Sequence, residues 1–298
     1  MQPHDWRGVF PAITTPFHSD LSIDERALDA HVRWLVERGV RGIVPLGSLG
    51  EGATLTHDEK VRVLEICRRA IGDRVPLVAG ISALSTAEAV ALACAAQRVG
   101  CDGLMVLPPY VYRGDEREML AHVDAVFAAT PLPAMLYNNP IAYGTDFTPP
   151  QIATLCARHA NLQAVKESSG DVRRITAIRE RLGDRVALFV GLDDLVVEGV
   201  CAGAVGWIAG LVNALPDASV RLFDLAVAGD VARTRALYDW FLPLLRLDTV
   251  PKFVQLIKLV QREVGRGSSV VRPPRLELEG AELDAALALI RERLATQP

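Results

Sequence analysis

Several residues at the ends of apolar runs have side chains that can carry out chemistry, and Lys166 is the most informative of them. It ends the run 162–166, Leu-Gln-Ala-Val-Lys, which is typical of a buried strand. Burial disfavours the charged form of an amine, and a neutral amine attacks a ketone to form a carbinolamine and then an imine. Lys166 is therefore a candidate nucleophile that could form an imine with a ketone. By position alone, a lysine that reaches solvent or pairs with Glu167 is the alternative.

Tyr137 and the loop 47–51 are the next candidates. Tyr137 ends the preceding apolar run, and neighbouring strands lie about 4.8 Å apart, so its phenol can reach the amine and move protons during imine formation. The loop, Gly-Ser-Leu-Gly-Glu, can present backbone N–H groups to a carboxylate, and Ser48 adds a hydroxyl. A core tyrosine and an ordinary turn are the alternatives for these two features.

Other possible chemistries lack their motifs in this sequence. Asp193 and Asp194 form an acidic pair without a matching histidine, so we expect a helix N-cap there and no metal site. No GxGxxG motif follows an apolar run, which argues against a dinucleotide-binding site. The sequence also contains no GxSxG motif, which argues against a serine hydrolase.

The elements that must position these groups alternate along the chain. Eight short apolar runs are each followed by an amphipathic segment, a pattern typical of parallel strands buried on both faces. Eight units of similar spacing predict an α/β fold, a (β/α)8 TIM barrel with additional C-terminal helices. A doubly wound open sheet is the main alternative. The expected strands are 8–17, 42–47, 76–81, 103–109, 133–137, 162–166, 187–191 and 206–210.

The expected helices start with acidic or capping residues and mostly end at glycine. They are 24–38, 58–71, 86–99, 115–129, 151–158, 171–182 and 194–202, then 219–228, 231–245, 252–264 and 281–295. We expect the barrel over 1–220. The segment 221–298 is expected to hold the last barrel helix and a helical extension, packed on the barrel as one unit.

Composition narrows the class of protein. The 298 residues are 50% hydrophobic with a net charge of −4, which argues against a strongly basic nucleic-acid binder. Five scattered cysteines predict free thiols in a reducing compartment. No signal peptide is visible, and no run approaches the roughly 18 apolar residues of a membrane span. We expect a cytoplasmic protein without nucleic-acid or membrane partners.

The strand ends, in this order, resemble the dihydrodipicolinate synthase / N-acetylneuraminate lyase family of class I aldolases. The segments 47–51, 109–110, 137–140 and 166–171 resemble the family motifs G-[ST]-x-G-E, PPY, Y-N-x-P and K-E-[AS]-[ST]-G-[DN]. The resemblance extends from Gly8 to about Pro216. All four motifs in the correct order make it specific.

The resemblance implies roles for residues. Lys166 would form the imine, Tyr137 would relay protons, and Ser48 with the backbone of Leu49 would hold the substrate carboxylate. It implies pyruvate as a substrate, no metal, no cofactor beyond the lysine imine, and a homotetramer built as a dimer of dimers. The positions that we assign to substrate binding are Leu49, Gly50, Tyr110, Tyr112, Tyr143 and Ile208.

Departures from the family pattern concern the second substrate. The synthases carry a second tyrosine where this chain has Val111, an arginine where it has Ala142, and a second loop hydroxyl where it has Leu49. Losing the arginine removes a bidentate carboxylate anchor, so we do not expect lysine biosynthesis. His57 and Glu88 match positions of the family's lysine-regulatory site, whereas Lys60 and Leu84 do not, so feedback inhibition by lysine is not expected either.

The leading hypothesis is a lyase for pyruvate-dependent aldol cleavage or condensation. The first alternative is a dehydratase of 2-keto-3-deoxy sugar acids or related oxo acids that uses the same imine. A remote alternative is a non-catalytic barrel that binds a carboxylic acid.

Overall fold

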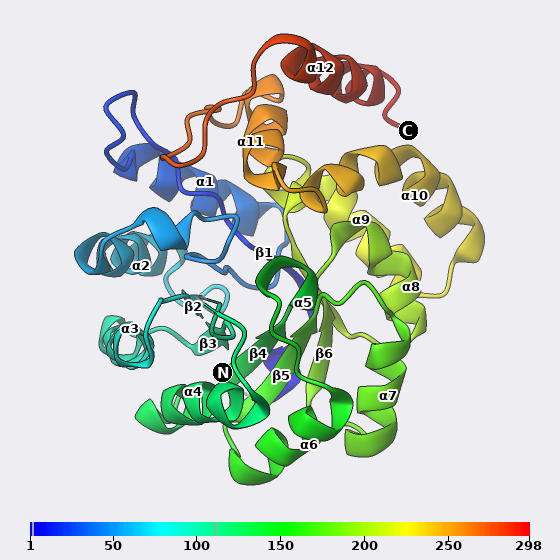
Figure 1. The fold of residues 1–298 in the computed structure, drawn as a ribbon. Helices are drawn as coiled ribbons and strands as arrows, with labels where there is room; N and C mark the ends of the chain where they lie inside the picture. The colour runs from blue at the N-terminus through cyan, green and yellow to red at the C-terminus, as the bar shows by residue number, and fades with distance from the viewer. Residues whose placement is uncertain (2, 111) are drawn as a thin grey trace.

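A curled parallel sheet forms the centre of the molecule, and helices surround it (Figure 1). This computed structural model describes residues 1, 3–110 and 112–298, so Val111, one of the departures noted above, lies outside the described residues. The sheet order is β1-β7-β6-β5-β4-β3-β2, and all pairs are parallel. The strands are β1 Gly8–Pro11, β2 Val78–Ile81, β3 Gly103–Val106, β4 Ala134–Asn138, β5 Leu162–Glu167, β6 Ala187–Val190 and β7 Gly206–Ala209.

The expected strand 42–47 is present only as two isolated parallel bridges, one toward each edge of the sheet. Val44 bridges to Ala12 after β1, and Ile43 bridges to Leu77 before β2. Pro45 has no N–H to donate to a neighbouring strand, and Leu46 has a positive φ of 68°. The segment therefore lies between the two edges of the seven-stranded sheet without the regular geometry of a strand.

The helices begin and end close to the expected positions, because their caps are local. The Asp115 and Thr56 side chains cap α4 and α2 in capping boxes, and Gly100 ends α3 in the left-handed conformation. The short helix α5, just after β4, was not predicted. The helices are α1 Glu25–Glu37, α2 His57–Ile71, α3 Thr86–Val99, α4 Glu116–Ala129, α5 Pro140–Tyr143, α6 Pro149–Arg158, α7 Arg173–Leu182, α8 Val196–Cys201, α9 Pro216–Val227, α10 Val231–Leu245, α11 Phe253–Glu263 and α12 Gly280–Ala295.

The last three helices pack beside one another at one edge of the molecule (Figure 1). The Trp240 indole of α10 donates to the Arg293 carbonyl of α12 over 2.8 Å. The link between α11 and α12 reaches back to the N-terminal third of the chain, where Arg272 forms an ion pair with Glu59 of α2. Among the described residues, no helix is long and apolar enough to cross a membrane.

Candidate active site

A pocket of about 500 Å³ opens at the carboxyl ends of the strands, with Lys166 and Tyr137 in its wall. The two residues face each other in the β4–β5 register, and each is at most 6% exposed. Lys166 Nζ lies 3.8 Å from the centroid of the Tyr137 ring. The amine thus contacts the face of the ring, and the Tyr137 hydroxyl accepts a hydrogen bond from Asn139 Nδ2 at 2.9 Å.

Lys166 is neither turned to solvent nor paired with Glu167. The Glu167 carboxylate accepts from Asn138 Nδ2 and from the Ser169 backbone N–H, at 3.1 and 2.7 Å. Burial raises the pKa of Glu167, and these hydrogen bonds oppose that effect. Within the described chain, Lys166 has no ion-pair partner within 4 Å, so its amine is available to a ligand in the pocket.

A cluster of hydroxyl groups lies beside the lysine. The hydroxyls of Ser48 and Tyr143 are hydrogen-bonded to each other. The Tyr143 ring meets Tyr137 edge-on, with centroids 5.8 Å apart, and meets Tyr110 at 5.5 Å. Burial raises the pKa of Tyr143 well above its usual value, so its hydroxyl stays protonated at neutral pH. These groups can donate and accept protons close to the amine.

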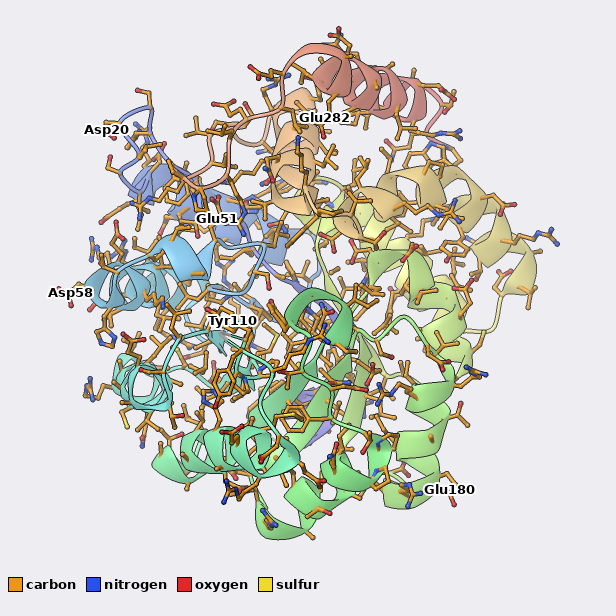
Figure 2. The ribbon with its side chains drawn as sticks, in the orientation of Figure 1. Asp20, Glu51, Asp58, Tyr110, Glu180 and Glu282 are labelled. Carbon is orange, nitrogen blue, oxygen red and sulfur yellow. The ribbon has the colours of Figure 1, made fainter. Side chains whose placement is uncertain are left out.

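The loop that carries Ser48 and Leu49 is held rigidly from behind. Gly50 packs against backbone, and a Cβ there would come within 2.8 Å of the Ile13 carbonyl oxygen. Glu51 adopts a positive φ of 53°, and its buried carboxylate pairs with Lys258 of α11 at 2.5 Å. Figure 2 labels Glu51 on the side of the molecule where the link between α11 and α12 approaches α2.

The predicted site residues divide into two groups. Ser48, Leu49, Tyr143 and Ile208 line the same pocket as Lys166 and Tyr137. Three others do not line it. Gly50, in the loop 47–51, packs against backbone. The Tyr110 hydroxyl is hydrogen-bonded to the Ser82 hydroxyl at 3.2 Å, and its ring contacts Tyr143. The Tyr112 side chain is 59% exposed.

The expectation that Asp193 and Asp194 cap a helix is wrong. Both lie inside a 3-10 turn, Asp193–Leu195, and neither side chain caps it. The fully buried Asp193 carboxylate instead accepts from the Trp207 indole and from the Gly210 and Leu211 backbone N–H groups. Burial raises the pKa of Asp193 to about 6, and these hydrogen bonds oppose the shift. Asp193 therefore ties the end of β6 to the end of β7.

Two polar residues of the pocket wall, Asp248 and Arg275, were not among the predicted residues. Asp248 follows α10 and packs directly against Gly210, where no Cβ would fit, and its Oδ1 is buried without a hydrogen-bond partner. Both belong to the C-terminal segment, whose position over the strand ends is a tertiary feature without a local sequence signal. In the described part of the chain, no group of three or more His, Cys, Asp or Glu residues could hold a metal ion.

Comparisons with known proteins agree with this geometry. The sequence pattern of the Dihydrodipicolinate synthetase family matches residues 5–293. The chain belongs to this family. It is 34% identical to the 4-hydroxy-tetrahydrodipicolinate synthase of Agrobacterium fabrum, over 95% of this chain and 97% of that protein. It is 35% identical to the enzyme of the same name from Haloarcula marismortui, over 98% and 94% of the two chains.

Solved structures of the family share the fold. The chloride-inhibited dihydrodipicolinate synthase from Acinetobacter baumannii, complexed with pyruvate, superposes with a TM-score of 0.90 at 28% identity. The match covers 96% of this chain and 98% of that chain. The protein is thus a lyase of the dihydrodipicolinate synthetase family, and its sheet and helices are of the TIM-barrel type.

Proposed function

We propose that the protein is a pyruvate-dependent aldolase-type lyase in which Lys166 forms the imine. The observation that carries the proposal is a buried amine in the wall of a pocket, in contact with Tyr137 and without an ion-pair partner among the described residues. The family supports the same chemistry, since the A. baumannii synthase was solved with pyruvate bound.

The proposed aldol reaction proceeds through an imine and an enamine. The Lys166 amine attacks the ketone carbon of the oxo acid, and the carbinolamine loses water to give the imine. Loss of a C3 proton from the protonated imine gives an enamine, which attacks an aldehyde and forms a C–C bond. Hydrolysis of the new imine releases the product and restores the amine. Run in reverse, the sequence cleaves a C–C bond and yields pyruvate and an aldehyde.

We assign the proton transfers to the hydroxyl cluster. Tyr137 contacts the amine with its ring, and Tyr143 joins it to Ser48 at the loop that is expected to hold the substrate carboxylate. Tyr143 therefore supplies a second tyrosine from within this chain. Acid–base groups of this kind are worth roughly 10²–10⁴-fold in rate.

A dehydratase is the second candidate function. The buried carboxyl of Asp248 in the pocket wall favours it. Burial raises the pKa of Asp248 well above its usual value, which favours the protonated carboxyl that can donate a proton. A neutral acid in the wall that holds Lys166 could protonate a departing substrate hydroxyl, which would leave as water while the enamine supplies the electrons. Aldolase and dehydratase share the imine and differ in their products.

Borohydride trapping tests the shared step. Borohydride reduces an imine to a stable amine, so pyruvate and borohydride together should add the mass of the reduced adduct to the peptide that contains Lys166. Lys166→Ala should give no adduct. If neither pyruvate nor longer 2-oxo acids modify the wild-type protein at Lys166, the Schiff-base proposal fails, and a non-catalytic carboxylate-binding barrel becomes the better explanation.

Three structural features belong to the same proposal. We propose that segment 42–47 takes the place of the eighth strand, so that the sheet closes into a barrel. We propose that 1–220 and 221–298 fold as one unit, supported by the buried ion pair between Glu51 and Lys258. We retain the homotetramer as the expected assembly.

A further inference from the structure

Arg275 is an unusual arginine in this molecule. It lines the pocket that contains Lys166, it is partly buried, and its guanidinium makes no hydrogen bond, ion pair or ring contact within the described chain. Other arginines without such contacts lie on the exposed surface: Arg7, Arg26, Arg41, Arg69, Arg98, Arg113, Arg117, Arg181 and Arg221. A guanidinium has five N–H donors in a planar fork that matches a carboxylate. Arg275 lies in the wall of the pocket, and its donors have no hydrogen-bond partner in the described chain.

The segment that carries Arg275 is fixed on both sides. Buried Lys258 donates to the Val270 carbonyl over 2.7 Å, and the Arg272 backbone N–H donates to Glu51 over 3.0 Å. The Arg272 guanidinium forms two hydrogen bonds to Glu59, at 2.6 and 2.8 Å. After Arg275, Gln255 Nε2 donates to the Leu276 carbonyl over 3.2 Å. A side chain on such a backbone is positioned before a ligand arrives, which lowers the entropic cost of binding.

Among the described residues, no carboxylate lies within ion-pair distance of Arg275. Asp248 is the carboxyl among the described residues of the pocket wall, and it lies outside ion-pair distance of Arg275. Burial also raises the pKa of Asp248 well above its usual range. Glu51, on the same side, is already paired with Lys258. Arg275 therefore contributes a positive charge without an ion-pair partner in the described chain to the pocket wall, while Ala142 contributes none.

We propose that Arg275 binds a second carboxylate at the far end of the substrate, so that the enzyme acts on a 2-oxo acid with an anionic group at each end. One carboxylate would lie at the Ser48–Leu49 loop, the ketone carbon at Lys166, and the distal carboxylate at Arg275. This inference rests on the proposed imine at Lys166 and adds the class of substrate.

Imine trapping with a matched series of oxo acids tests the inference. We would measure the concentration that half-saturates borohydride trapping on Lys166 for 2-oxoglutarate, 2-oxoadipate and 2-oxopimelate. The ω-methyl ester of each serves as the comparison with nearly the same shape and no distal charge. The three lengths are needed because the chain length that fits reflects the distance from the imine to the guanidinium.

The expected result is a preference for the dianion over its ester of roughly 10- to 100-fold at one length, the usual worth of a charged hydrogen-bonded pair. Arg275→Met should abolish the preference, Arg275→Lys should retain part of it, and Arg98→Met, at an exposed arginine outside the pocket, should leave it unchanged.

Two results would overturn the inference. One is equal half-saturation by dianions and esters at all three lengths, and the other is a dianion preference that survives in Arg275→Met. Trapping of pyruvate by the wild-type protein separates these failures from a failure of the proposed function. If pyruvate is trapped on Lys166 and either result is seen, the imine stands and only the assignment of Arg275 falls.

Discussion

Removing the ammonium of Lys258 should destabilise the protein far more than removing an exposed lysine. Lys258 and Glu51 are 2% and 0% exposed at their side chains and lie 2.5 Å apart. In Lys258→Met, the Arg272 backbone N–H would remain as the one hydrogen-bond donor to the Glu51 carboxylate among the described residues. Removing one partner of a buried ion pair leaves the other charge uncompensated and lowers the free energy of unfolding by about 3–5 kcal/mol.

The expected change is large enough to measure in two ways. Urea denaturation should show a loss of about 3–5 kcal/mol in the free energy of unfolding. For a chain of this length, that corresponds to a decrease in Tm of roughly 5–8 °C. Lys252→Met is the matched control, because Lys252 and its partner Glu282 are each 50% exposed. An exposed pair is worth about 1 kcal/mol or less.

Substitution of the other partner, Glu51, gives an independent check. Burial lowers the pKa of Lys258, so in Glu51→Gln the lysine can lose its proton instead of remaining as an unpaired charge. A lysine whose folded-state pKa is depressed makes folding more favourable as the pH rises toward its ordinary value of 10.5. Glu51→Gln should therefore regain stability between neutral pH and pH 10. A loss below 1 kcal/mol in Lys258→Met, equal to that in Lys252→Met, would refute the reasoning.

Three further predictions concern the pocket and the assembly. Tyr143→Phe and Tyr137→Phe should each lower kcat by roughly 10²–10⁴-fold while pyruvate binding persists, and normal turnover in either would remove that tyrosine from the relay. Asp248→Asn should be more stable than the wild type at pH 8, by about 1.4 kcal/mol for each unit by which folding raises the pKa of Asp248, because the amide has no ionised form for burial to disfavour. Because the folded-state pKa of Asp248 is raised, this advantage should shrink as the pH falls toward 4, and a pH-independent difference would contradict the assignment. Sedimentation should give about four times the 32.3 kDa of one chain, and a monomer would overturn the expected tetramer.

The sequence by itself determined the alternation of elements and the ends of most helices. Caps and helix-terminal glycines act within a few residues, so α3, predicted over 86–99, matches Thr86–Val99 at both ends. The segment 42–47 forms only isolated bridges to both edges of the sheet, and Pro45 lacks an N–H, an effect that the apolar pattern of the run hides. The positions of Lys166 and Tyr137 at neighbouring strand ends also followed from the sequence, since parallel strands place their carboxyl ends at one edge.

Only the tertiary structure decided which side chains complete the pocket. Asp193 is a buried acceptor for β7 and not a helix cap, because its partners lie 14 to 18 residues further along the chain. Tyr143 joins Ser48 to Tyr137 through α5, a four-residue helix too short to show a periodic pattern. Asp248 and Arg275 reach the pocket from a segment more than 80 residues beyond Lys166. Their roles depend on how the chain from the end of α10 to the start of α12 packs over the strand ends. Contacts between distant segments leave no periodic or local signal in the sequence.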